Sequence, residues 1–275
     1  MRTERRQHAT RRELLATGLG AAAALAFGRI GAASAGDYGP FKFGIQSYSL
    51  REFGLDEALK LTKELGLNYW ESYSAHTPPD PARAAEYKKK AADQGVTILS
   101  FGVSRFSKDH DANRKLFEFG KAMGFTSLSA DPDPDAFDSL DKLVEEYGIA
   151  IGIHNHGPGH RYGPIETITK AIQNHNPKIG CCLDCGHLLR STEDPVQAVE
   201  ALGSRIYGVH LKDVKDATKF TVLGEGDLKT AALMKALAGR KYDYIMALEY
   251  EENPKAPMGE IKECLATARK AAAGL

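Results

Sequence analysis

Apolar and β-branched residues recur along the chain in eight short runs. Within most runs the apolar residues are consecutive rather than alternating, which is typical of strands buried on both faces in a parallel sheet. The predicted strands occupy residues 41–47, 67–71, 96–102, 125–129, 149–154, 179–184, 205–211 and 244–249.

Helical patterns lie between these runs, and four of them end at a glycine. They span residues 55–66, 83–95, 113–124 and 137–148. Glycine is the residue that most easily adopts the positive φ found just past a helix end. One strand follows the next after about 25 to 40 residues, which is room for a strand and a returning helix. We therefore predict one α/β domain folded as a single (β/α)8 TIM barrel.

Four polar residues fall at the carboxyl ends of the last four predicted strands: His154, Asp184, His210 and Glu249. Side chains two positions apart share a face of a strand, and the residues two positions earlier are small. They are Gly152, Cys182, Gly208 and Ala247. Each polar residue alone is equally compatible with a structural hydrogen-bonding role. Together, two imidazoles and two carboxylates at the end where barrels build their sites indicate a divalent-metal centre.

Residues 1–35 match an export leader. Residues 10–15 (TRRELL) form a twin-arginine pattern, residues 18–27 are apolar, and residues 33–35 (ASA) resemble a cleavage site. We predict twin-arginine export to the periplasm, a mature domain of residues 36–275, and no stable membrane span after cleavage. The apolar stretch is shorter than the ~20 residues of a spanning helix. An uncleaved amphipathic tail or membrane anchor is the alternative.

Charge and cysteine content narrow the function classes. Without its leader the chain has a net charge of −4 and no long basic run. This balance argues against nucleic acid as a partner and favours a small, uncharged substrate. Cys182 and Cys185 have the spacing of half a zinc or redox motif, but no second cysteine pair completes it. Packing of small residues is therefore the favoured role of the cysteines. The pattern leaves the oligomeric state open, including a homo-oligomer.

The residues around the four strand ends resemble the xylose isomerase-like TIM-barrel superfamily, in the group described as sugar phosphate isomerases/epimerases. The similarity covers nearly all of residues 41–270, and its motifs specify the superfamily better than the substrate. The motifs are residues 183–187 (LDCGH), 209–213 (VHLKD), 223–227 (LGEGD) and 248–249 (LE).

This resemblance implies a divalent ion held by a strand-five Glu, a strand-six Asp, a strand-seven His and a strand-eight Glu. Asp184, His210 and Glu249 match the last three, whereas His154 replaces the expected strand-five Glu. Imidazole suits Mn, Zn, Co or Fe better than Mg.

The replacement also removes one carboxylate from the family's two-base epimerase scheme. Glu249 remains as the candidate base for a proton next to a carbonyl, with a metal-stabilised enediolate. His156 and His187 are the candidates for the opposing acid, or else they support neighbouring groups.

Further candidates for substrate contacts lie at other strand ends and loops: Trp70, Glu71, Lys212 and Glu225. Trp70 is expected to stack on a sugar ring, or to pack under a helix. Lys212 is expected to polarise a substrate oxygen, or to pair with Asp213. The three charged residues are equally compatible with ordinary positions at the barrel rim.

We therefore expect a metal-dependent isomerase or epimerase of a keto-sugar or related polyol. A metal-dependent lyase or hydratase acting by elimination on an oxidised sugar or glycoside is the alternative, and export together with His154 favours it. A non-catalytic sugar-binding barrel is a third hypothesis. An endonuclease for abasic DNA is disfavoured by the leader, the charge and the lack of additional metal-binding residues.

Overall fold

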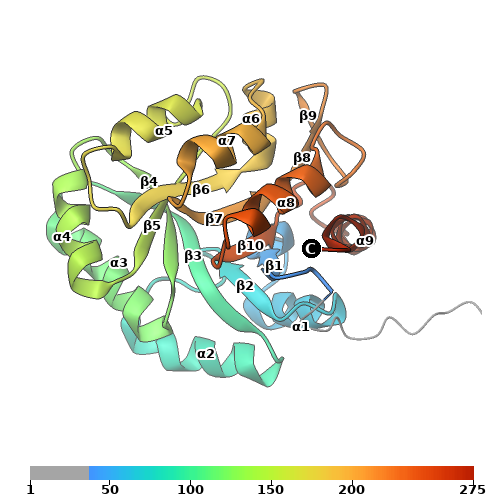
Figure 1. The fold of residues 1–275 in the computed structure, drawn as a ribbon. Helices are drawn as coiled ribbons and strands as arrows, with labels where there is room; N and C mark the ends of the chain where they lie inside the picture. Colours follow the sequence, from blue (N-terminus) through green and yellow to red (C-terminus); the bar gives the residue numbers. More distant parts are fainter. Residues whose placement is uncertain (1–36) are drawn as a thin grey trace, which may run out of the picture. The chain divides into compact units, whose positions relative to one another are not determined.

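The computed structural model describes residues 37–275, so the predicted leader, residues 1–35, lies outside the described residues. Eight parallel strands close into a barrel in the order β1-β10-β7-β6-β5-β4-β3-β2 (Figure 1). The strands are β1 Lys42–Gln46, β2 Tyr69–Ser72, β3 Thr97–Phe106, β4 Ser127–Pro132, β5 Ala150–His154, β6 Ile179–Asp184, β7 Ile206–Leu211 and β10 Ile245–Leu248. The predicted TIM barrel is confirmed, with a strand in each of the eight predicted runs.

Helices surround the barrel and connect its strands (Figure 1). They are α1 Leu55–Glu64, α2 Ala84–Asp93, α3 His110–Met123, α4 Phe137–Tyr147, α5 Ile165–Ile172, α6 Cys185–Arg190, α7 Pro195–Leu202, α8 Thr230–Gly239 and α9 Met258–Ala272, with short 3-10 turns at Ser47–Leu50 and Pro81–Arg83. The glycines that follow the first four helices all have positive φ, between 70° and 81°. The prediction that these helices end at glycine is confirmed.

Small residues in the barrel interior allow strands β5, β6 and β7 to approach one another beneath the predicted site. A Cβ on Gly152 would lie 2.9 Å from the backbone nitrogen of Cys182. A Cβ on Gly208 would lie 2.9 Å from the Cys182 sulfur. Real Cβ atoms do not approach so closely, so larger side chains at these glycines would force the strands apart. The small residues leave the space above them to His154, Asp184 and His210.

An antiparallel hairpin of β8 Asp213–Lys215 and β9 Lys219–Thr221 follows strand β7 and was not predicted. The side chain of Asp213 holds the loop behind it: its carboxylate accepts hydrogen bonds from the backbone nitrogens of Val214, Gly224, Gly226 and Leu228, at 2.8–3.1 Å. The alternative that Asp213 pairs with Lys212 is therefore wrong, because its oxygens are used by backbone N–H groups.

The state of the cysteines agrees with the expected packing role. All four cysteines are free and buried, as expected for residues that pack in the core. Within residues 37–275, none of the helices has both the length and the apolar character that crossing a membrane requires.

A matched pair of glycine substitutions tests the helix ends. Gly124 has φ 81°, whereas Gly259 lies inside α9, and a Cβ at either position meets no atom within 4 Å. We expect Gly124→Ala to destabilise the protein by about 1 kcal/mol, because L residues are strained at positive φ. Gly259→Ala should be neutral or stabilising. Thermal unfolding measures both, and equal effects of the two substitutions would contradict the assignment.

Candidate active site

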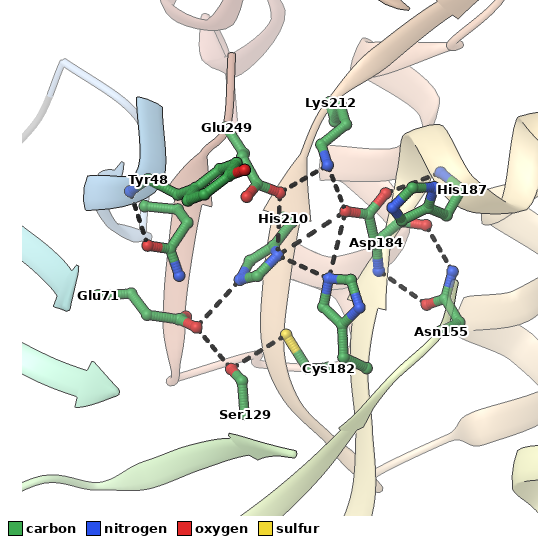
Figure 2. A network of polar contacts seen from close by, with 12 residues as sticks. Tyr48, Glu71, Ser129, Asn155, Cys182, Asp184, His187, His210, Lys212 and Glu249 are labelled. Atoms are coloured by element: carbon green, nitrogen blue, oxygen red, sulfur yellow. Dashed lines mark hydrogen bonds and ion pairs between the residues drawn. The ribbon is translucent and has the colours of Figure 1, made fainter. Parts of the chain in front are cut away.

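His154, Asp184, His210 and Glu249 converge at the carboxyl end of the barrel, as predicted. One ligand atom from each lies within 4.8 Å of all the others. His154 Nε2 is 3.0 Å from His210 Nδ1, and His210 Nδ1 is 3.2 Å from Glu249 Oε2. Asp184 Oδ2 lies 3.4 Å from His154 Nε2 (Figure 2). Four strands thus deliver two nitrogens and two oxygens to one point.

The chemistry of this cluster suits a divalent metal ion. All four side chains are at most 8 % exposed, and the buried oxygens Asp184 Oδ2 and Glu249 Oε2 face the imidazole nitrogens and the ammonium of Lys212. Two imidazole nitrogens that face each other at 3.0 Å have room for only one proton between them. A metal cation could take the place of that proton and bind the carboxylates as well. The cluster could therefore hold a divalent ion, and mixed nitrogen and oxygen donors match Mn, Fe, Co or Zn.

His210 is oriented from below by Glu71. The Nε2 atom of His210 lies 3.1 Å from Glu71 Oε1, which also accepts a hydrogen bond from Ser129 Oγ at 2.6 Å. Figure 2 shows both residues on the far side of His210 from Lys212. Burial opposes the charged form of His210, but Cys182, Glu71 and Glu249 raise its pKa well above the usual value. A charged His210 carries a hydrogen on both ring nitrogens, so an ion bound at Nδ1 would replace the hydrogen there and leave the one on Nε2 toward Glu71.

Glu71, Cys182 and His210 form a second, deeper group whose ligand atoms lie within 4.8 Å of one another. Burial raises the pKa of the Cys182 thiol, which opposes the thiolate that a metal would require. Because Glu71 also bonds Ser129, this group fits a support for His210 better than a second metal site.

Asp184 is fixed by its position at the start of helix α6. Its Oδ1 atom caps the helix by accepting the backbone N–H of His187 at 2.7 Å. Asn155 brackets the Asp184 backbone with two hydrogen bonds of 2.8 Å. Oδ2 is thereby directed into the cluster. Asn155 was not among the predicted site residues, although it directly follows His154.

Lys212 supplies a buried positive charge beside the cluster. Its Nζ atom lies 3.0 Å from Asp184 Oδ2, 2.7 Å from Glu249 Oε2 and 2.5 Å from Glu251 Oε1. Burial alone would lower the pKa of Lys212, but the three carboxylates raise it well above its usual value. Burial alone would raise the pKa of Glu249, but Lys212 and His210 lower it to about 2. Both groups are therefore charged at neutral pH. Glu251 was not among the predicted residues.

His156 and His187 lie beside the cluster, with ring centroids 4.6 and 5.8 Å from that of His154. Burial lowers the pKa of His156 to about 3 and that of His187 to about 4, so both rings are neutral at neutral pH. Arg190 Nη1 lies 3.2 Å from His187 Nδ1, and arginine can only donate. Nδ1 of His187 is therefore the acceptor, and its hydrogen is on Nε2.

The other predicted substrate contacts, Trp70, Glu71 and Glu225, do not line the open side of the cluster. Trp70 is fully buried in the hydrophobic core, where its ring stacks on His76. The alternative of packing under a helix fits this position better than sugar stacking. Glu225 is exposed, with Thr221 Oγ1 3.4 Å from its carboxylate. Glu71 is fully buried beneath His210 and not at the rim. These positions do not support substrate contacts for Trp70, Glu71 or Glu225.

The contact between Glu71 and His210 yields a prediction for metal affinity. We expect Glu71→Gln to weaken metal binding by about 10- to 100-fold, because an amide orients His210 less strongly than a carboxylate does. Titration calorimetry with Mn²⁺ or Zn²⁺ measures the affinity, and the unfolding midpoint controls for stability. Glu225→Gln is the same substitution at an exposed glutamate, and this variant should bind metal like the unaltered protein. Unchanged affinity in Glu71→Gln would show that Glu71 does not orient a ligand.

Comparisons with known proteins agree with the fold. Inosose dehydratase of Clostridium tetani is 31 % identical over 134 residues, which are 42 % of this chain and 45 % of that protein. 3-oxo-isoapionate decarboxylase of Pectobacterium atrosepticum is 27 % identical over 177 residues, 58 % of this chain and 61 % of that protein. The chain thus matches about half the length of these relatives, which are both named as enzymes.

Among solved structures, 3-keto-D-glucoside 4-epimerase of E. coli superimposes with a TM-score of 0.68 at 15 % identity. The match covers 84 % of this chain and 99 % of the epimerase, and it shows a common fold. A family model described as xylose isomerase-like TIM barrel matches residues 59–270, well over half of the chain. The chain therefore belongs to the xylose isomerase-like TIM-barrel family.

Proposed function

We propose that the protein is a divalent-metal-dependent enzyme that removes a proton next to the carbonyl of a keto-sugar or related polyol. The observation that carries the proposal is the convergence of four buried ligand atoms from His154, Asp184, His210 and Glu249 within 4.8 Å. Carbohydrate-converting relatives support a sugar as the substrate.

His154 Nε2, Asp184 Oδ2, His210 Nδ1 and Glu249 Oε2 would hold the ion. A divalent ion bound there supplies Lewis-acid polarisation of the substrate carbonyl, which acidifies the neighbouring C–H bond. We propose Mn, Zn, Co or Fe in preference to Mg, because two of the four donors are imidazole nitrogens.

Glu249 and His187 have protonation states suited to opposite roles. Lys212 and His210 keep Glu249 ionised, so the carboxylate is an acceptor for the substrate proton throughout the neutral range. The neutral His187 ring carries its hydrogen on Nε2, since Arg190 occupies Nδ1, and it donates a hydrogen bond to a developing oxyanion. Nδ1 of His156 has no hydrogen-bond partner among residues 37–275, and His156 is a second neutral imidazole available for proton transfer.

Isomerisation or epimerisation is the first candidate reaction, and elimination is the second. Both begin with the same proton removal, and they diverge in whether a neighbouring C–O bond then breaks. The fold match to an epimerase is compatible with the first. The sequence match to inosose dehydratase favours the second. Release of water or an alcohol occurs only in elimination, so product analysis by NMR separates the two.

We also keep the proposal that the protein is exported to the periplasm. It rests on the twin-arginine pattern and the cleavage site within residues 1–35. Replacing Arg11 and Arg12 by lysine should retain the protein in the cytoplasm if this pathway is used.

Metal analysis combined with solvent exchange tests the proposed function. We expect about one divalent ion per chain, lost in Asp184→Ala and His210→Ala, because each variant removes a ligand and leaves buried polar groups unpaired. In deuterated water, metal-loaded protein should introduce deuterium into a keto-sugar next to its carbonyl. Glu249→Gln should abolish this label, because the acceptor of the proton is removed.

Asp227→Ala is the control, since Asp227 is exposed and outside the cluster. Full metal content in the Asp184 and His210 variants would disprove the ligand set. A metal-loaded protein that binds sugar without exchange or turnover would identify a sugar-binding barrel instead of an enzyme.

A further inference from the structure

Arg190, the last residue of α6, carries a half-buried guanidinium without an acidic partner. No carboxylate within residues 37–275 forms an ion pair with it within 4.0 Å. Two other cations near this end of the barrel have acidic partners: Lys212 has three carboxylates, and Arg161 has Asp131 and Asp133. A positive charge in a half-buried position is costly unless a partner compensates it.

Arg51, another arginine near the cluster, differs in how its donors are used. Its Nη1 and Nη2 atoms donate to the backbone carbonyls of Tyr48 and Glu251, at 3.2 and 2.6 Å. Among the described residues, Arg190 makes a single hydrogen bond, to His187 Nδ1. Of the five N–H donors of a guanidinium, four are therefore left for a ligand at Arg190.

Two contacts hold the Arg190 guanidinium in place. Its central carbon lies 5.2 Å from the ring centre of Phe220, which belongs to β9 of the unpredicted hairpin. On the loop after β5, a Cβ added to Gly157 would lie 3.0 Å from Arg190 Nη1. A side chain at this position would shift the guanidinium by a few tenths of an ångström. A cation fixed in this way loses little conformational freedom when it binds an anion.

The imidazole of His187 lies between the Arg190 guanidinium and the cluster. His187 bonds Arg190 through Nδ1, and its backbone N–H bonds Asp184. Its ring lies 5.8 Å from the ring of His154. A sugar whose carbonyl lies at the cluster could therefore place a substituent a few atoms away against Arg190.

We propose that Arg190 binds an anionic oxygen group of the substrate, either a carboxylate or a phosphate ester, while the reacting carbonyl lies at the cluster. This proposal rests on the proposed function and replaces the expectation of an uncharged substrate, which came from the net charge alone. The planar guanidinium fork matches the paired oxygens of both groups.

Binding of unreactive probes to metal-loaded protein tests the proposal independently of catalysis. The probes are a six-carbon alditol, its terminal phosphate and the matching aldonate, which all lack the keto group. We expect the unaltered protein to bind at least one anionic probe about 10- to 100-fold more tightly than the alditol. The preferred anion distinguishes a phosphate ester from a carboxylate.

Arg190→Gln should abolish this preference without changing alditol affinity, and Arg190→Lys should retain part of it. Arg161→Gln is the matched control, because that guanidinium is already neutralised, and it should keep the full preference. Gly157→Ala should weaken the binding of the anionic probe and not that of the alditol, because the added methyl group shifts the guanidinium. Unfolding midpoints confirm that each variant is folded.

The proposal is overturned if the unaltered protein shows no anionic preference, or if Arg190→Gln keeps it. A preference that persists in Arg190→Gln would assign the anion to the metal ion instead. If the preference depends on Arg190 but no keto-sugar exchanges deuterium, the proposed function fails while the anion site stands. If a neutral keto-sugar exchanges deuterium but the protein shows no anionic preference, the proposed function stands and the anion site fails.

Discussion

The contacts of the His210 imidazole are the interaction on which the candidate site depends. One ring nitrogen lies 3.1 Å from the buried carboxylate of Glu71, and the other lies 3.0–3.7 Å from His154, Glu249 and Asp184. A single side chain thus links the packed interior of the barrel to the group of atoms that could hold a metal. Because Glu71 is itself fixed by Ser129, the orientation of His210 is determined by three strands.

This arrangement requires space, which the barrel provides through small residues. Gly152, Cys182 and Gly208 lie one layer below the cluster and pack too closely for larger side chains. Lys212 also offsets part of the negative charge of the site. It lies beside Asp184 and Glu249, and it keeps these two buried carboxylates ionised. Arg190 differs from Lys212, because no carboxylate within residues 37–275 pairs with it, and a substrate anion would compensate its charge.

Much of the fold and of the cluster could be predicted because strand periodicity is local. Consecutive apolar residues indicated strands buried on both faces, and glycines marked helix ends. The two-residue repeat then placed four polar side chains on one face. Glu71 was predicted at the rim because its depth depends on the stagger between strands and on a β-bulge between Trp70 and Glu71. The residue pattern of a single strand indicates neither the stagger nor the bulge.

The hairpin β8–β9 was missed for a different reason. Each of its strands has three residues, too few for a period, and Asp213 stabilises the loop through backbone N–H groups that the sequence does not display. Asn155 and Glu251 are likewise defined by partners distant in sequence. Such contacts become visible only when the strands are assembled.

Crystallography of Mn²⁺-loaded protein with anomalous scattering tests the central claim most directly, because it locates the ion without reference to activity. The account predicts a single strong anomalous peak bonded to His154 Nε2, Asp184 Oδ2, His210 Nδ1 and Glu249 Oε2. A peak among Glu71, Cys182 and His210, or no peak in this end of the barrel, would contradict it.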